Sequence, residues 1–106
     1  MDINHNLVNG CPLCEIFINP EKYIKTKVYY PKIDKLNTSE FIILDCETCK
    51  IPMAVVRDHT TNVSKELWGK VLYECKNQFG YNIQLRCKPK KIFDHFHCHV
   101  IEKKRY

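Results

Sequence analysis

The feature of this 106-residue chain that most constrains its fold is a row of histidines near its end, where residues 95–101 read H-F-H-C-H-V-I. In a β-strand, successive side chains point to opposite faces, so His95, His97 and His99 would share one face and the apolar residues the other. Neighbouring imidazoles would then lie about 6.5–7 Å apart. An expression tag would be a contiguous run instead. The alternation therefore predicts a strand with a core-facing side and an imidazole side suited to metal binding or catalysis.

The remaining sequence predicts an α+β domain. Helices are expected at 11–18, where Pro12 suits a first helical turn, and from Asn62 or Ser64 to Gly80, where apolar residues recur at helical spacing. Strands are expected at 25–30, 40–45, 51–57, 81–86 and 93–101. The order α-β-β-β-α-β-β predicts an antiparallel-rich five-stranded sheet with a short N-terminal helix and one longer helix.

Length and composition predict a single domain over residues 1–106, with 44% apolar residues to build one core. Residues 1–10 are polar and lack the apolar segment of a signal peptide, so we expect a flexible N-terminal stretch. No apolar run approaches transmembrane length. We therefore expect a cytoplasmic protein without a membrane partner, in which the cysteines remain reduced.

The formal net charge of +5 comes mainly from lysine, because only Arg57, Arg86 and Arg105 among the 17 basic residues are arginines. Such a surface is compatible with an anionic ligand. It lacks the clustered arginines and aromatic residues of a dedicated nucleic-acid binder, which argues against a nucleic-acid partner.

Seven cysteines are present, and Cys11 and Cys14 form a C-x-x-C pair on the expected first helix. Two thiols one helical turn apart can reach the same metal ion, and two imidazoles could complete a tetrahedral site. A redox pair is the alternative, although no strand precedes this motif as it does in thioredoxin-like folds. Cys75, Cys87 and Cys98 are interpreted as small apolar residues.

The histidine segment resembles the signature of the histidine triad (HIT) family, histidine–apolar–histidine–apolar–histidine–apolar–apolar, at every position. Weaker similarities flank it: G-Y-N-I at 80–83, V-V-R-D-H at 55–59 and V-I-E-K-K-R at 100–105. The resemblance covers residues 11–105 and implies a HIT-like fold, a nucleotide or nucleotide-conjugate ligand and a homodimer.

For the metal, the resemblance implies one structural Zn²⁺ held by Cys11, Cys14, His59 and His95. A second C-x-x-C, Cys46 to Cys49, makes a four-cysteine site conceivable. However, Cys49 precedes His59 by ten residues of mostly extended chain, which is about 30 Å. If His59 lies beside the first cysteine pair, the second pair lies at the other end of the sheet. We therefore favour two cysteines and two histidines, a closed shell that is structural.

For the chemistry, the resemblance implies that His97 attacks the α-phosphate of a nucleotide derivative and forms a nucleotidyl-histidine intermediate, which water hydrolyses. His99 would donate a hydrogen bond to the phosphoryl oxygens or the leaving group. Candidate substrates are nucleoside phosphoramidates, dinucleoside polyphosphates and nucleotide-sugar-like esters.

The chain departs from the family in the connection before the triad, which reads C-K-P-K-K-I-F-D in place of small and polar residues. Lys91 and Ile92 occupy the family's Gln and Ser/Thr positions, and its ribose-contacting Asn falls near Arg86. We interpret Lys90, Lys91 and Arg86 as substrate-binding residues. Two alternatives stay open: a catalytically silent nucleotide-binding module, favoured by this rebuilt connection, and a redox protein that uses both C-x-x-C pairs.

Overall fold

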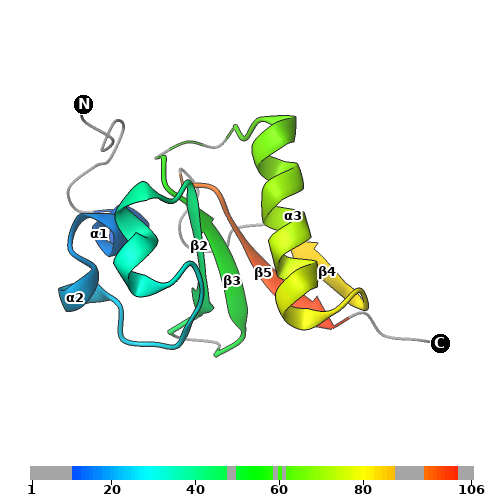
Figure 1. The fold of residues 1–106 in the computed structure, drawn as a ribbon, viewed down its shortest axis with the longest axis horizontal. Helices are drawn as coiled ribbons and strands as arrows, with labels where there is room; N and C mark the ends of the chain where they lie inside the picture. The colour runs from blue at the N-terminus through cyan, green and yellow to red at the C-terminus, as the bar shows by residue number, and fades with distance from the viewer. Residues whose placement is uncertain (1–10, 48–49, 59, 61, 88–94, 103–106) are drawn as a thin grey trace.

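The computed structural model describes residues 11–47, 50–58, 60, 62–87 and 95–102 (Figure 1). Residues 1–10, which we expected to be a flexible stretch, lie outside the described residues. The elements are α1 (Pro12–Ile18), α2 (Pro20–Tyr23), β1 (Val28–Tyr30), the 3-10 helix η1 (Ile33–Thr38), β2 (Phe41–Asp45), β3 (Pro52–Val56), α3 (Lys65–Phe79), β4 (Ile83–Arg86) and β5 (His97–Glu102). None of the described helices is both long and apolar enough to cross a membrane.

The strands form one antiparallel sheet of five strands in the order β1-β2-β3-β5-β4. This confirms the α+β class and the antiparallel sheet. The short helices α2 and η1 were not predicted; α2 begins at Pro20, a residue suited to a first helical turn. The prediction of one strand over 93–101 is wrong at its start, because β5 begins at His97 and His95 lies in a bend before it. Residues 93 and 94 lie outside the described residues.

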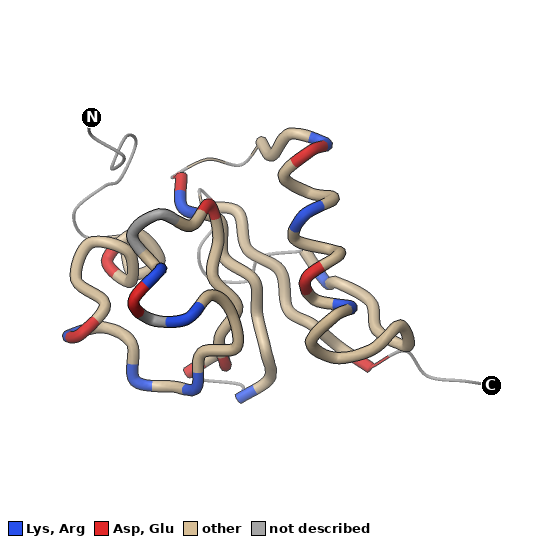
Figure 2. Tube along the Cα trace, viewed as in Figure 1, with Lys and Arg blue, Asp and Glu red and all other residues tan. Residues whose placement is uncertain are grey.

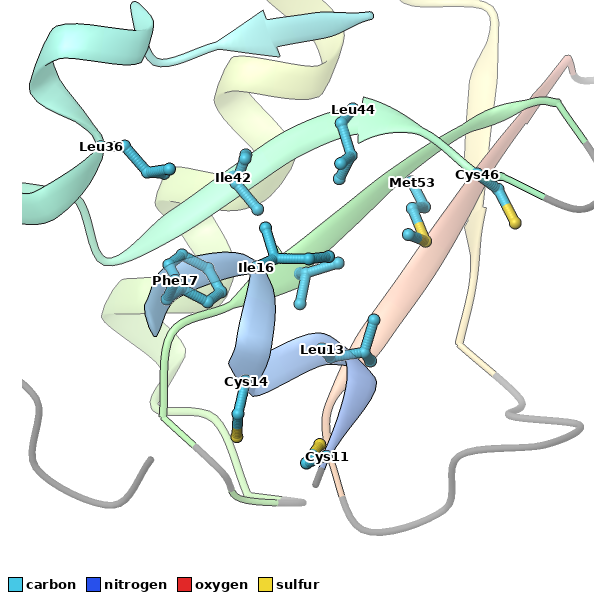
Figure 3. Close-up of a cluster of buried hydrophobic side chains, with 11 residues drawn as sticks. Cys11, Leu13, Cys14, Ile16, Phe17, Leu36, Ile42, Leu44, Cys46 and Met53 are labelled. Carbon is cyan, nitrogen blue, oxygen red and sulfur yellow. The ribbon is translucent and has the colours of Figure 1, made fainter. Parts of the chain in front are cut away.

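Helices cover both faces of the sheet (Figure 1). On the face we call the α1 face, the buried cluster joins Leu13, Ile16 and Phe17 of α1 to Ile42, Leu44, Met53 and Val55 of the sheet (Figure 3). On the opposite α3 face, the alternate strand residues pack against Val71 and Cys75 of α3; they are Phe41, Ile43, Ala54 and Val56. Because alternate residues of β2 and β3 are buried on both faces, these strands read as continuous apolar runs.

Helix α3 begins and ends as its sequence predicts. The Ser64 hydroxyl accepts a hydrogen bond from the backbone N–H of Leu67 at 3.1 Å, so Ser64 is the N-cap. Gly80 follows the helix with a φ of 90°, a conformation that favours glycine. These two residues fix the length of α3 and direct the chain into β4.

The buried side chain of Arg57, the residue directly after β3, contacts η1, the residue that follows it and α1. Its side chain is 5% exposed and donates hydrogen bonds to the carbonyl oxygens of Ser39 at 2.8 Å and Leu36 at 2.5 Å. Its guanidinium lies 4.9 Å from the ring centre of Phe17 in α1. Arg57 therefore holds the end of η1 and α1 against β3, which is a structural role.

Candidate metal centre and histidine strand

The first helical turn of α1 carries Cys11 and Cys14 into the interior. Cys11 is the N-cap residue, Pro12 begins the helix, and the Cys11 carbonyl accepts from the N–H of Glu15 at 3.0 Å. The exposed fractions of Cys11 and Cys14 are 8% and 0%. The helix geometry thus brings both thiols to one side of α1, as the spacing predicts.

His95 completes a group of three potential metal ligands. Its Nδ1 lies 3.3 Å from Sγ of Cys14 and 3.6 Å from Sγ of Cys11, and the three ligating atoms all lie within 4.8 Å of one another. The His95 side chain is 1% exposed. This buried group could hold a metal ion, and soft thiolates with an imidazole are ligands that zinc accepts.

A hydrogen bond on the far side of the His95 ring selects the nitrogen that faces the thiols. Nε2 of His95 lies 2.6 Å from the carbonyl oxygen of Val56. A carbonyl can only accept, so Nε2 carries the proton and Nδ1 of the neutral ring keeps its lone pair. That lone pair is directed at Cys11 and Cys14. Buried hydrogen-bond partners of this kind orient metal-binding histidines in proteins.

Cys46, the described member of the other cysteine pair, is not brought to this group. Cys46 is buried at the turn after β2, and Figure 3 shows it on the opposite side of the α1-face cluster from Cys11 and Cys14. Cys46 is absent from the group of ligands found among the described residues. Cys49 and His59, the second cysteine of the rival site and the expected fourth ligand, both lie outside the described residues.

His97 and His99 lie side by side on the α1 face. In the β3–β5 pairing His97 is opposite Val55 and His99 is opposite Met53, and opposed residues of antiparallel strands share a face. The centres of the two imidazole rings are 5.9 Å apart. Both side chains are partly buried, in contrast to the fully buried His95.

Hydrogen bonding also distinguishes the two nitrogens of His97. Nδ1 of His97 lies 2.9 Å from the carbonyl oxygen of His95, so Nδ1 carries the proton and Nε2 keeps its lone pair. Nε2 of His99 is buried and has no hydrogen-bond partner among the described residues. A buried polar nitrogen without a hydrogen-bond partner destabilises the folded protein by about 1–3 kcal/mol. A hydrogen bond from this nitrogen to a ligand or a water molecule would remove that cost.

Comparisons with protein-family models, with curated proteins and with solved structures find no match to this chain.

The structure corrects the interpretation of Cys87 and Cys98 as free, apolar-packing cysteines, because the two form a disulfide. The β4–β5 pairing sets Arg86 opposite His99, so the next pair along the strands is Cys87 and Cys98, with Cα atoms 4.3 Å apart. Sequence reasoning missed this bond because it depends on the register of strands that are not hydrogen-bonded until the sheet forms. Cys75 is fully buried, as predicted.

Of the expected substrate-binding residues, only Arg86 lies within the described part of the chain, where it is exposed on β4. Lys90 and Lys91 lie outside the described residues. A groove of about 780 Å³ opens at the other face, lined by residues that include Tyr30, Phe41 and Tyr73. Its lining contains neither histidine nor cysteine.

Proposed function

We propose that this chain is a HIT-family nucleotide-phosphate hydrolase or nucleotidyl transferase, stabilised by one Zn²⁺ and acting through a nucleotidyl-histidine intermediate. The observation that carries the proposal is the pair of fixed tautomers at His95 and His97. The His95 ring presents its Nδ1 lone pair to two thiols. The backbone carbonyl oxygen of His95 accepts a hydrogen bond from Nδ1–H of His97, so Nε2 of His97 would be the nucleophilic nitrogen. One residue would thus connect the metal to the reacting group.

For the metal, Cys11, Cys14 and His95 would supply three ligands, with His59 proposed as the fourth. The chain next to His59 supports this assignment, because the Thr60 carbonyl accepts from the N–H of Phe96 at 2.7 Å, directly beside His95. When bound, zinc would hold α1 to the segment before β5. With four protein ligands, the zinc would have no open coordination position for a substrate, so its role would be structural.

For the reaction, Nε2 of His97 would attack the α-phosphorus of a nucleotide ester or amide. A phosphorus–nitrogen bond forms, and the bond to the leaving group breaks with its electron pair. Water then attacks the phosphorus, the phosphorus–nitrogen bond breaks, and the imidazole recovers its lone pair. The products are a mononucleotide and the released group. The carbonyl of His95, bonded to Nδ1–H, would stabilise the positive ring of the intermediate.

His99 would assist from the next position on the same face. With its ring 5.9 Å from that of His97, it could donate a hydrogen bond to a phosphoryl oxygen or to the leaving group as charge develops there. Its Nε2 has no hydrogen-bond partner among the described residues, which supports a role for a ligand atom at this position.

The test is to incubate purified, zinc-loaded protein with adenosine phosphoramidate and with diadenosine triphosphate, and to measure released AMP. We expect AMP from wild type and none above background from His97→Asn. Nucleotide binding without turnover by wild type would instead support the catalytically silent module. A wild-type protein that neither binds nor cleaves nucleotides would refute the nucleotide function altogether.

A further inference from the structure

Arg86 differs from the other described lysines and arginines because it lies within a strand of the sheet. The chain contains 17 lysines and arginines, and Figure 2 shows the charged residues mainly on helices and connections. Within the described strands, Arg86 is the one basic residue. It lies directly opposite His99 in the β4–β5 pairing, so the two side chains leave the sheet on the same face.

Within the described strands, no carboxylate lies on the same face as this charge. The acidic strand residues are Asp45 and Glu102, and the alternation of side chains sets both on the α3 face. Asp45 also accepts a hydrogen bond from Tyr29 at 2.8 Å. The Arg86 side chain is exposed, and no ion pair or hydrogen bond joins it to another described residue. Among the described residues, the charged guanidinium of Arg86 therefore has no anionic partner on the face that carries His99.

The strand pair that carries Arg86 is fixed in register. Four residue pairs join β4 to β5, from Ile83 with Glu102 to Arg86 with His99. The Cys87–Cys98 disulfide adds a covalent bond immediately beyond the Arg86 pair. Because side chains alternate, this disulfide lies on the face opposite His97 and His99, where it holds the strands without occupying the ligand's side. Arg86 is thus presented from a rigid position.

We propose that Arg86 is a specificity-determining residue that recognises a second phosphate, the one that departs when His97 attacks the first. This rests on the proposed function. The register places the Arg86 side chain nearer to His99 than to His97, on the side where the leaving group lies if His99 assists its departure. When the bond from the α-phosphorus to the bridging oxygen breaks, the electron pair and negative charge pass to the departing phosphate. A guanidinium can bind such a phosphate through two parallel N–H donors.

The preferred substrates are therefore nucleotides with at least two linked phosphates, such as dinucleoside polyphosphates. Phosphoramidates, whose leaving amine gains a proton and carries no negative charge, gain nothing from Arg86. The loss of Arg86 should therefore affect only one substrate class, whereas the loss of His97 should affect both.

The experiment compares kcat/KM for diadenosine triphosphate and adenosine phosphoramidate in zinc-loaded wild type, Arg86→Gln and Arg86→Lys. Lys65→Gln is the matched control, because it removes an exposed basic charge from α3 on the other side of the sheet. In Arg86→Gln we expect a loss of about 10- to 100-fold for the triphosphate and less than about 3-fold for the phosphoramidate. We expect Arg86→Lys to retain part of the activity on the triphosphate, and Lys65→Gln to leave kcat/KM unchanged for both substrates. The melting temperature of each variant reports on folding.

Equal losses for the two substrates, or no loss for either, would overturn the inference and leave the proposed function intact. If wild type binds nucleotides without cleaving them, the ratio of ADP to AMP affinity becomes the readout. That ratio must then fall in Arg86→Gln, and an unchanged ratio refutes the inference. If wild type binds no nucleotide, both the proposed function and this inference fail.

Discussion

The carbonyl oxygen of Val56 lies 2.6 Å from Nε2 of His95 and determines which nitrogen of that buried ring presents a lone pair to Cys11 and Cys14. The same bond ties the end of β3 to the segment that precedes β5. The group of potential metal ligands therefore depends on three parts of the chain that are distant in sequence: the start of α1, the end of β3 and the segment before β5. Each of them can be tested separately.

Removing one thiol should abolish metal binding. We expect wild type to contain one zinc per chain, and Cys14→Ser to contain none, because the remaining donors cannot complete a tetrahedral shell. The loss should lower the melting temperature by roughly 4–8 °C for each kcal/mol of stability lost in a domain of this size. Elemental analysis and thermal denaturation measure both effects. Cys46→Ala, another buried cysteine, is the control and should retain zinc; if Cys46→Ala loses the metal or wild type has none, the assignment is wrong.

Replacing His97 should separate catalysis from folding. His97→Asn should keep its zinc and its melting temperature but lose turnover by roughly 10³-fold or more, because an asparagine side chain cannot form the nucleotidyl-histidine intermediate. Mass spectrometry of acid-sensitive adducts in rapidly quenched wild type should detect a nucleotidyl group on His97. His99→Asn is the comparison, expected to be about 10²-fold slower while still forming the adduct. Activity of His97→Asn within a few-fold of wild type would contradict the mechanism.

The sequence predicts much of this arrangement, and the misses have physical causes. Alternation of apolar residues and histidines correctly predicts the shared face of His97 and His99, because a strand's period is a local property. The bend and complete burial of His95 are not local, since they depend on α1 and on the Val56 carbonyl. The Cys87–Cys98 bond likewise requires the register of β4 with β5, which no short stretch of sequence specifies.

Arg57 illustrates the same limit. In the sequence, Arg57 belongs to the segment V-V-R-D-H, which resembles the HIT family, whereas in the structure its side chain donates hydrogen bonds to the carbonyl oxygens of Leu36 and Ser39. A basic residue after a strand is usually expected to be solvated. Only the fold shows that η1, an element that was not predicted, supplies one of these carbonyl groups and that Ser39, the residue directly after η1, supplies the other.

Breaking the disulfide should destabilise the sheet at the histidine strand. The chain-entropy model gives about 3 kcal/mol for a bond that closes a segment of this length, with a separation of 11 residues. Urea denaturation with and without a phosphine reductant, which spares the zinc, should show this loss in wild type. Without the reductant, Cys87→Ala should already have the lower free energy of unfolding that reduced wild type shows, and the reductant should not change it further. If denatured wild type has the same number of alkylatable thiols before and after reduction, the bond does not form.

Cys75 should give the protein a specific sensitivity to alkaline pH. Burial, with a smaller contribution from the charge of Glu74, raises the pKa of the Cys75 thiol from 9.0 to about 12. Below pH 9 the thiol is protonated in both the folded and the unfolded chain, so its contribution to stability is fully present. Between the two pKa values the unfolded chain releases this proton and the folded chain keeps it. The free energy of unfolding then falls by at most about 1.4 kcal/mol per pH unit.

The measurement is urea denaturation of wild type and Cys75→Val from about pH 8 to about pH 10.5, where the folded thiol stays neutral. Other groups titrate equally in both proteins, so their effects cancel in the difference. Above pH 9 the difference in unfolding free energy should move in favour of the valine variant, which has nothing to ionise in the unfolded chain. In the native protein, Cys75 should also resist alkylation, because the thiolate is the reactive form. A difference that is constant across this range, or rapid alkylation of Cys75, would show that its pKa is close to the ordinary value.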